Sequence, residues 1–144
     1  MIDCYTLPIG DQVFTQVVSG KNIVYAVTRI REHCLRTFEP VRLTVLQRSH
    51  AKMIIDARGL EDDRIVRALM TKNYAPLLYL SQDDGSHLLA DGSHTYVARM
   101  ILGHRQALAY IVDQSVWQDF LVYGFPTEEM SEEELLTSHS RIRV

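Results

Sequence analysis

The sequence predicts an α+β fold: a single domain with a mixed β-sheet, helices packed on it and a β-rich N-terminal extension. The chain has 144 residues, of which 47% are hydrophobic and 23% are charged, and this balance is typical of one globular domain with its own core. Short runs rich in Val, Ile, Leu and Tyr have the length of strands, mostly in the first third. Segments after residue 60 change to the period of helices.

Residues 1–56 are predicted to be mostly strand. Two β-rich runs, 12–18 and 23–28, flank Gly20-Lys21-Asn22, as in a hairpin. Residues 29–36 have mixed polarity and are predicted to form a short helix. The runs 41–46 and 51–56 again have strand length, and the polar residues between them predict a second hairpin.

Residues 57–112 are predicted to form the core of the domain. A helix is expected at 60–72, where Glu61-Asp62-Asp63 places negative charge in the first turn, as the helix dipole favours. Pro76 prevents its continuation, and a buried strand follows at 77–80. The remaining elements are a turn at 82–85, a strand at 86–90, a helix at 96–102 ended by Gly103, and a strand at 107–112.

Residues 113–126 are predicted to hold a C-terminal helix that begins at Ser115, with Trp117, Phe120 and Leu121 at packing spacings. Residues 127–144 form an acidic tail, in which 131–136 is expected to be a solvated helix or a segment that binds a partner.

Composition narrows the classes of function. A net charge of -3 gives no general attraction to nucleic acid, so such binding would need a local basic patch. The two cysteines, Cys4 and Cys34, cannot build a disulfide framework and lack zinc-binding spacing, which favours a reducing, cytoplasmic location. No apolar run approaches the ~20 residues of a membrane span, and no signal peptide is expected.

The turn Asp91-Gly92-Ser93-His94-Thr95 is the most informative segment, because it joins an apolar strand to the start of a helix. Unpaired N–H groups and the helix dipole make such a turn a site for anions such as phosphate. Gly92 would let the backbone approach the phosphate oxygens, and a protonated His94 would add a charged donor. The structural alternatives are a helix-capping Asp91, a solvated His94 and ordinary first-turn hydroxyls on Ser93 and Thr95.

Residues 60–112 resemble the ParB/sulfiredoxin superfamily in the order of their elements. That core runs helix, Pro-containing strand, hairpin, Asp-Gly-x-His-Arg turn, helix, Leu-Gly and strand. The corresponding segments here are Leu60-Glu61-Asp62-Asp63-Arg64-Ile65, Ala75-Pro76-Leu77-Leu78-Tyr79-Leu80, Leu89-Ala90-Asp91-Gly92-Ser93-His94 and Ile101-Leu102-Gly103-His104-Arg105, followed by 107–112. Arg58 stands just before the first helix, where many members carry an arginine.

The resemblance implies a nucleoside triphosphate, ATP or CTP, with its phosphate chain on this turn and Mg²⁺ as a possible cofactor. Phosphoryl transfer or hydrolysis would use Asp91 as general base or indirect Mg²⁺ ligand and His94 as phosphate contact. The implied nucleotide-binding residues are Gly92, Ser93, His94, Thr95, Arg58, Arg99 and Arg105. The acidic group Glu61-Asp62-Asp63 is a weaker candidate for Mg²⁺ contact, whereas Asp83 and Asp84 are interpreted as turn formers.

This sequence departs from the family pattern at Thr95, where the family has an arginine that grips phosphate. Arg99 shares the helix face of Thr95 and would supply the missing charge, as would Arg105 or Arg58. No cysteine lies near the motif, so sulfiredoxin activity is not expected. Residues 113–144, which follow the core here, are fewer than the DNA-binding and dimerisation domains of a partition protein need, so a complete partition protein is not expected.

Three functions remain open at this point. The first is the nucleotide-binding domain, with or without phosphoryl transfer. The second is a degenerate member without nucleotide turnover that acts as a protein-interaction or regulatory module, alone or as a homodimer. The third is a DNA-binding or nuclease protein of partition type, for which the sequence offers scattered basic residues: Arg29, Arg31, Arg36, Arg42, Arg48 and Lys52.

Overall fold

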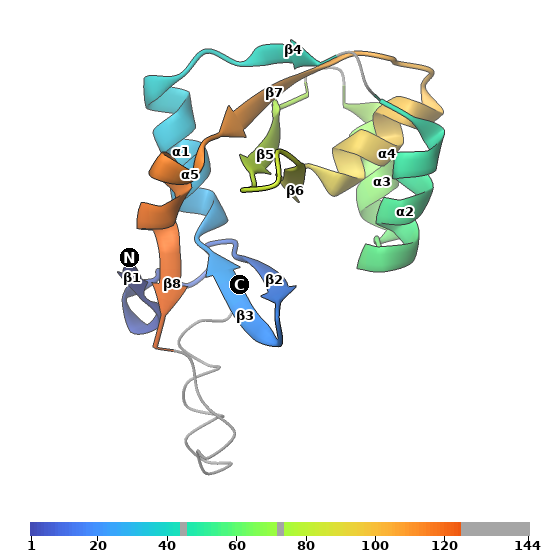
Figure 1. Ribbon diagram of the computed structural model, residues 1–144. Coiled ribbons are helices and arrows are strands. Elements are labelled where there is room, and N and C mark those ends of the chain that lie inside the picture. Colours follow the sequence, from blue (N-terminus) through green and yellow to red (C-terminus); the bar gives the residue numbers. More distant parts are fainter. Residues whose placement is uncertain (44–45, 72–73, 125–144) are drawn as a thin grey trace. The chain divides into compact units, whose positions relative to one another are not determined.

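The computed structural model describes residues 1–43, 46–71 and 74–124 (Figure 1). The described residues form an α+β structure with two four-stranded sheets. The chain divides into two compact units, which we call unit 1 (residues 1–36 and those from 113 onward) and unit 2 (residues 37–112). The α+β class is confirmed, while the prediction of a single domain stays a prediction.

Unit 1 contains a sheet with the strand order β1 (Ile2–Asp3), β8 (Leu121–Tyr123), β3 (Lys21–Tyr25) and β2 (Phe14–Val18). Strand β1 runs parallel to β8, and the other neighbours are antiparallel. The predicted first hairpin is confirmed, but Val18 pairs with Lys21, so the turn is Ser19-Gly20. Both turn residues have positive φ, 52° and 76°, as the tight turns of two-residue hairpins require.

The helices of unit 1 are α1 (Val27–Thr37) and the short α5 (Gln114–Trp117), with single 3-10 turns at Cys4–Thr6 and Gln118–Phe120. The helix predicted at 29–36 is confirmed and is longer at both ends. The helix predicted from Ser115 ends earlier than expected, because Leu121 begins β8 and pairs with β3. Residues 125–126 and the acidic tail, including the helix predicted at 131–136, lie outside the described residues.

The interior of unit 1 contains a cluster formed by Ile2, Cys4, Leu7, Val24, Ala26 and Val122. Tyr25 is fully buried, and its ring packs against that of Trp117 in a T-shaped pair with 5.3 Å between the centroids. The Tyr25 hydroxyl donates to Gln16 Oε1 at 2.8 Å. Segments near both ends of the described chain therefore share one sheet and one core.

Unit 2 contains the second sheet, in the order β4 (Val41–Leu43), β7 (Ala107–Val112), β5 (Leu77–Ser81) and β6 (His87–Asp91). Strands β5 and β7 are parallel, and β5 and β6 form an antiparallel hairpin. The strands predicted at 77–80, 86–90 and 107–112 are confirmed, with the second shifted by one residue.

The hairpin predicted between 41–46 and 51–56 is wrong, and residues 1–56, predicted to be β-rich, contain helices as well as the strands β1 to β4. Residues 51–56 lie in a helix, α2 (Arg48–Arg58), and β4 pairs with β7 instead. Ala51, Ile54 and Arg58 are at least half-buried while Met53 and Ile55 are exposed, which is the spacing of a helix face. The apolar run at 51–56 is too short for its hydrophobic period to distinguish a helix from a strand.

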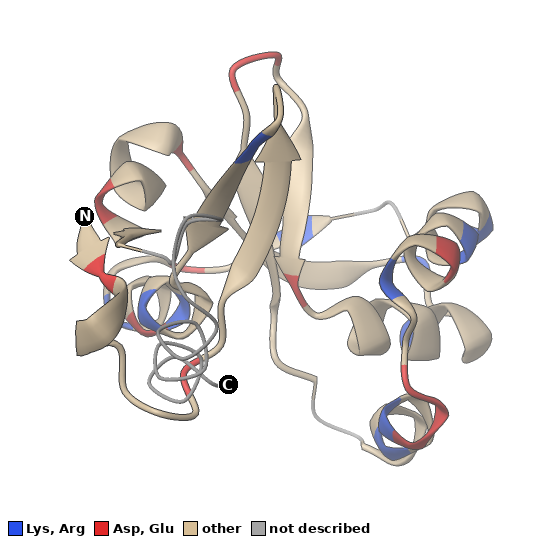
Figure 2. Cartoon of the chain, turned by 90° about the horizontal axis from the view of Figure 1, so that it is seen from below, with Lys and Arg blue, Asp and Glu red and all other residues tan. Residues whose placement is uncertain are grey.

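Two further helices complete unit 2. The helix predicted at 60–72 is confirmed as α3 (Asp62–Met70), with Asp62 and Asp63 in its first turn. The helix predicted at 96–102 is confirmed as α4 (Ser93–Ile101), which begins three residues earlier and packs against α2 and α3. Charged residues gather on the helices of unit 2 more than on its strands (Figure 2). No helix among the described residues is long and apolar enough to cross a bilayer.

Candidate functional site

The site is built around Gly92, which separates β6 from α4. Its φ is 105°, and its carbonyl oxygen accepts the first intrahelical bond, from the N–H of Tyr96 at 2.8 Å. A Cβ at this position would lie 2.7 Å from Cδ2 of Leu77 on β5. Gly92 therefore allows both the tight turn and the close approach of the turn to the sheet.

The first turn of α4 presents donors beside a cation. The N–H groups of Ser93, His94 and Thr95 precede the first intrahelical bond, so the helix offers them no acceptor. Arg58, the last residue of α2, donates from Nη1 to Ser93 Oγ at 2.6 Å. Burial lowers the pKa of Arg58 and the nearby Tyr79 opposes that shift, but a guanidinium remains charged at neutral pH. The structure thus brings Arg58, a predicted site residue, to the turn.

His94 lies in the same turn and faces the start of α3. Its Nε2 accepts the backbone N–H of Glu61 at 3.2 Å, which assigns the ring hydrogen to Nδ1. Burial and then the charge of Arg64 lower the pKa of His94, while Glu61 opposes them. The lowered pKa favours the neutral form of His94, in which Nδ1–H is the donor, and protonation would be needed for the charged donor considered from the sequence.

The lowered pKa of His94 predicts a pH dependence of stability. Since the unfolded histidine binds protons more readily than the folded one, the free energy of unfolding should decline as pH falls below about 6.5, the usual histidine pKa. The decline should level off below the folded pKa. Urea unfolding of the wild type and of His94→Gln between pH 5 and 8 would measure this, and an identical pH profile in the two proteins would contradict it.

A cavity of about 280 Å³ lies between α3 and the first turn of α4. Arg64 and Arg67 of α3 line it together with His94 and Thr95 of α4. Ala68, Thr71, Tyr74 and Ala75 complete the wall. The sequence reasoning missed both arginines, although residues 64, 67, 68 and 71 have the i, i+3, i+4, i+7 spacing of one helix face. The charge that Thr95 lacks is thus present on a neighbouring helix.

The acidic candidates lie in different settings. Asp91 is half-buried at the end of β6, opposite Leu78 of β5. The Asp84 carboxylate accepts the N–H and the hydroxyl of Ser86 at 2.9 and 2.6 Å, and these bonds lower its pKa, so its interpretation as a turn former is confirmed. Across the described residues, no group of three or more His, Cys, Asp or Glu side chains is placed to hold a metal ion.

Arg99 and Arg105 are not part of this turn. Arg99 donates to the Gln106 carbonyl at 2.8 Å and to His104 Nδ1 at 3.2 Å, and its guanidinium lies 5.0 Å from the centroid of the Tyr74 ring. Arg105 is exposed in the segment between α4 and β7. The basic residues considered for nucleic acid are divided, with Arg29, Arg31 and Arg36 in unit 1 and Arg42, Arg48 and Lys52 in unit 2.

The cavity between α3 and the first turn of α4 is suited to bind an anion that has several oxygen atoms. Backbone donors, the Thr95 hydroxyl and two arginine side chains face or flank one small cavity, and Arg58 adds a third positive charge at Ser93. No family model matches the chain, and no curated protein or solved structure resembles it closely enough to show a relationship. The site must therefore be interpreted from its own residues.

Proposed function

We propose that residues 57–112 form a ParB/sulfiredoxin-like domain that binds a nucleoside triphosphate, ATP or CTP, by its phosphate chain at the start of α4. The observation that carries the proposal is the cavity in which Arg64 and Arg67 meet His94 and Thr95 beside the N-terminus of that helix. The order of β5, β6, α4 and β7 along the chain also supports it, because the turn lies between the hairpin and the helix as in that family.

Binding would use three kinds of donor. The N–H groups of the first turn would hold one phosphate, with the close turn at Gly92 admitting its oxygens. Arg64 and Arg67 would neutralise the neighbouring phosphates, and Arg58 would shift from Ser93 to a phosphate oxygen or hold Ser93 in place. The neutral His94 would donate from Nδ1.

Turnover of the nucleotide is the finer part of the proposal. Asp91 precedes Gly92 at the end of β6, where its carboxylate would accept the proton of an attacking hydroxyl or water. Mg²⁺ would arrive with the nucleotide, since it takes most of its ligands from phosphate and water, and Asp91 would contact it through a water molecule. In this scheme Asp91 serves the chemistry, whereas the arginines serve binding.

The test is titration calorimetry with ATP, CTP, GTP and UTP, each with and without Mg²⁺. We expect saturable binding of one nucleotide, weakened about tenfold or more by Arg64→Ala or Arg67→Ala, because a hydrogen bond to a charged group contributes about 1.5–3 kcal/mol. Arg48→Ala, which removes an exposed arginine of α2 outside the cavity, is the matched control and should bind normally.

Asp91→Asn separates binding from turnover. The variant should retain nucleotide affinity but lose phosphate release or transfer, measured as inorganic phosphate over hours. Absence of saturable binding by all four nucleotides would refute the proposal, as would binding that neither arginine variant weakens.

A further inference from the structure

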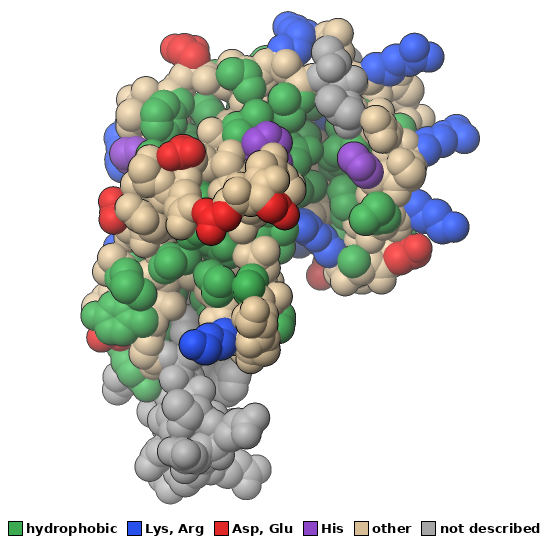
Figure 3. Space-filling view, viewed as in Figure 1, with side chains coloured by type: hydrophobic (Ala, Val, Ile, Leu, Met, Phe, Trp, Pro, Cys, Tyr) green, Lys and Arg blue, Asp and Glu red, His purple; other side chains and the backbone are tan. Residues whose placement is uncertain are grey.

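A second cavity, of about 410 Å³, lies in unit 2 between its sheet and the helices α2 and α4. Apolar side chains form most of its wall, and four of them are leucines: Leu43, Leu46, Leu77 and Leu89. His50 and His87 also line this cavity. Figure 3 shows hydrophobic side chains exposed in a hollow between histidine side chains. Its volume lies in the range of small-molecule sites.

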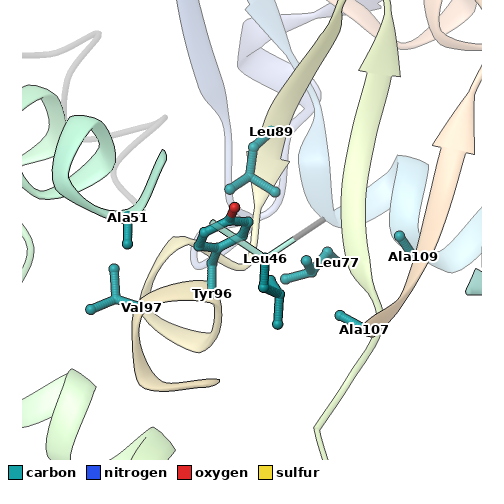
Figure 4. Close-up of a cluster of buried hydrophobic side chains, with 8 residues drawn as sticks. All are labelled: Leu46, Ala51, Leu77, Leu89, Tyr96, Val97, Ala107 and Ala109. Atoms are coloured by element: carbon teal, nitrogen blue, oxygen red, sulfur yellow. The ribbon is translucent and has the colours of Figure 1, made fainter. Parts of the chain in front are cut away.

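Strand β7 contributes a small side chain, Ala107, to the wall of the cavity. Ala107 and Ala109 of β7 point to the same face of the sheet and are 3% and 0% exposed. Figure 4 shows Leu46 and Leu77 between these alanines and the Tyr96 ring, which extends from α4 toward Leu89. Protein interiors normally close such spaces, because unfilled volume costs stability. An unfilled volume of this size is thus a candidate binding site.

The polar side chains that line the cavity are few: His50, Tyr79, His87 and Tyr96. Burial raises the pKa of Tyr79 to about 12, so its hydroxyl stays protonated and can donate. Ser81 Oγ lies 3.2 Å from His87 Nδ1, which leaves Nε2 of that ring for other contacts. The Tyr96 hydroxyl accepts the N–H of Gln47 at 3.0 Å, which fixes the ring against α2. A ligand in this cavity would bury an apolar body against the hydrophobic wall. It would also carry a hydrogen-bond acceptor for the donors among these side chains.

We propose that this cavity binds a medium-chain carboxylic acid, with its alkyl chain among the leucines and its carboxylate beside Tyr79, His50 and His87. His50 and His87 are exposed residues of the lining, and their ring N–H groups would donate to the carboxylate. The charged Arg58, which interacts electrostatically with Tyr79, adds positive potential there. The leucine and alanine side chains of the wall have no polar groups that could bind a ligand with a more hydrophilic body. The inference does not depend on nucleotide binding, because its cavity and that of Arg64 and Arg67 share no lining residue.

Titration calorimetry of the full chain with hexanoate, octanoate and decanoate, each below its micelle concentration, tests the proposal. We expect one site per chain, with affinity rising about fourfold for each added methylene until the cavity is full. Octanoate should bind at least tenfold more tightly than octanol, and His50→Ala combined with His87→Ala should remove that preference. Equal binding of octanoate and octanol by the wild type would overturn the assignment of the head group.

Ala107→Leu tests the position of the site by filling the cavity. It should weaken octanoate binding at least tenfold, whereas the matched control Leu108→Phe should not, because Leu108 is an exposed neighbour on the opposite face of β7. Circular dichroism establishes that each variant is folded. If Ala107→Leu does not fold, Leu89→Phe fills the same cavity from β6 and replaces it. No saturable binding of any acid, or binding that both filling variants leave unchanged, would overturn the proposal.

Discussion

Gly92→Ala is expected to lower the free energy of unfolding by about 3 kcal/mol. A non-glycine residue at φ 105° is strained by about 1–2 kcal/mol, and the new Cβ would lie 2.7 Å from Leu77 Cδ2. Leu77 is 1% exposed in the core of unit 2, so it cannot move aside without disturbing that packing, which costs a further 1–3 kcal/mol or so. Urea unfolding followed by circular dichroism would measure the loss.

Two comparisons separate the backbone strain at residue 92 from the steric clash with Leu77. Gly103→Ala at the other end of α4 also has positive φ, 82°, but its Cβ would meet nothing within 4 Å, so we expect a cost of only about 1 kcal/mol. In a Leu77→Ala background, Gly92→Ala should cost about 1–2 kcal/mol, because the clashing Cδ2 is gone. If Gly92→Ala lowers the free energy of unfolding equally in the wild-type and Leu77→Ala backgrounds, the contact with Leu77 does not contribute to its effect.

The elements of unit 2 that the sequence predicted well are those with strong local signals. The strands at 77–80 and 107–112 are short apolar runs bounded by Pro, Gly or polar residues, and such boundaries act locally. The helix at 60–72 has both an acidic first turn and a periodic face. The turn at 91–95 was recognised because glycine and polar residues interrupt an apolar strand just before a helical pattern.

The parts that were missed depend on contacts between distant residues. Helix α2 looked like a strand because a run of Ala, Met and Ile fits both periods, and its packing against α4 decided between them. Arg64 and Arg67 acquire their position only when α3 lies beside the first turn of α4. Leu121 belongs to a strand because β3, nearly a hundred residues earlier, pairs with it. Local propensity contains none of this information.

Trp117→Ala is expected to destabilise unit 1 by about 4 kcal/mol. Trp117 is 7% exposed and its ring meets that of the fully buried Tyr25, so truncation removes a large apolar contact and leaves a cavity beside Tyr25. Tyr25→Phe is the milder comparison, since it removes only the hydroxyl that donates to Gln16 and should cost about 1 kcal/mol. Thermal unfolding of both variants would rank the two contributions.

Trp117→Ala also tests the prediction of a single domain. If residues 1–144 unfold as one cooperative domain, Trp117→Ala must lower the midpoint for unit 2 as much as for unit 1, because no state with only one unit folded is populated. Amide resonances of Leu80 and Val112 in unit 2 and of Val24 in unit 1, followed through the transition by NMR, would give the midpoints separately. If Val24 of Trp117→Ala loses its native resonance under conditions in which Leu80 and Val112 retain theirs, the two units fold independently. The nucleotide and carboxylic-acid sites, both in unit 2, would then be measurable on that unit alone.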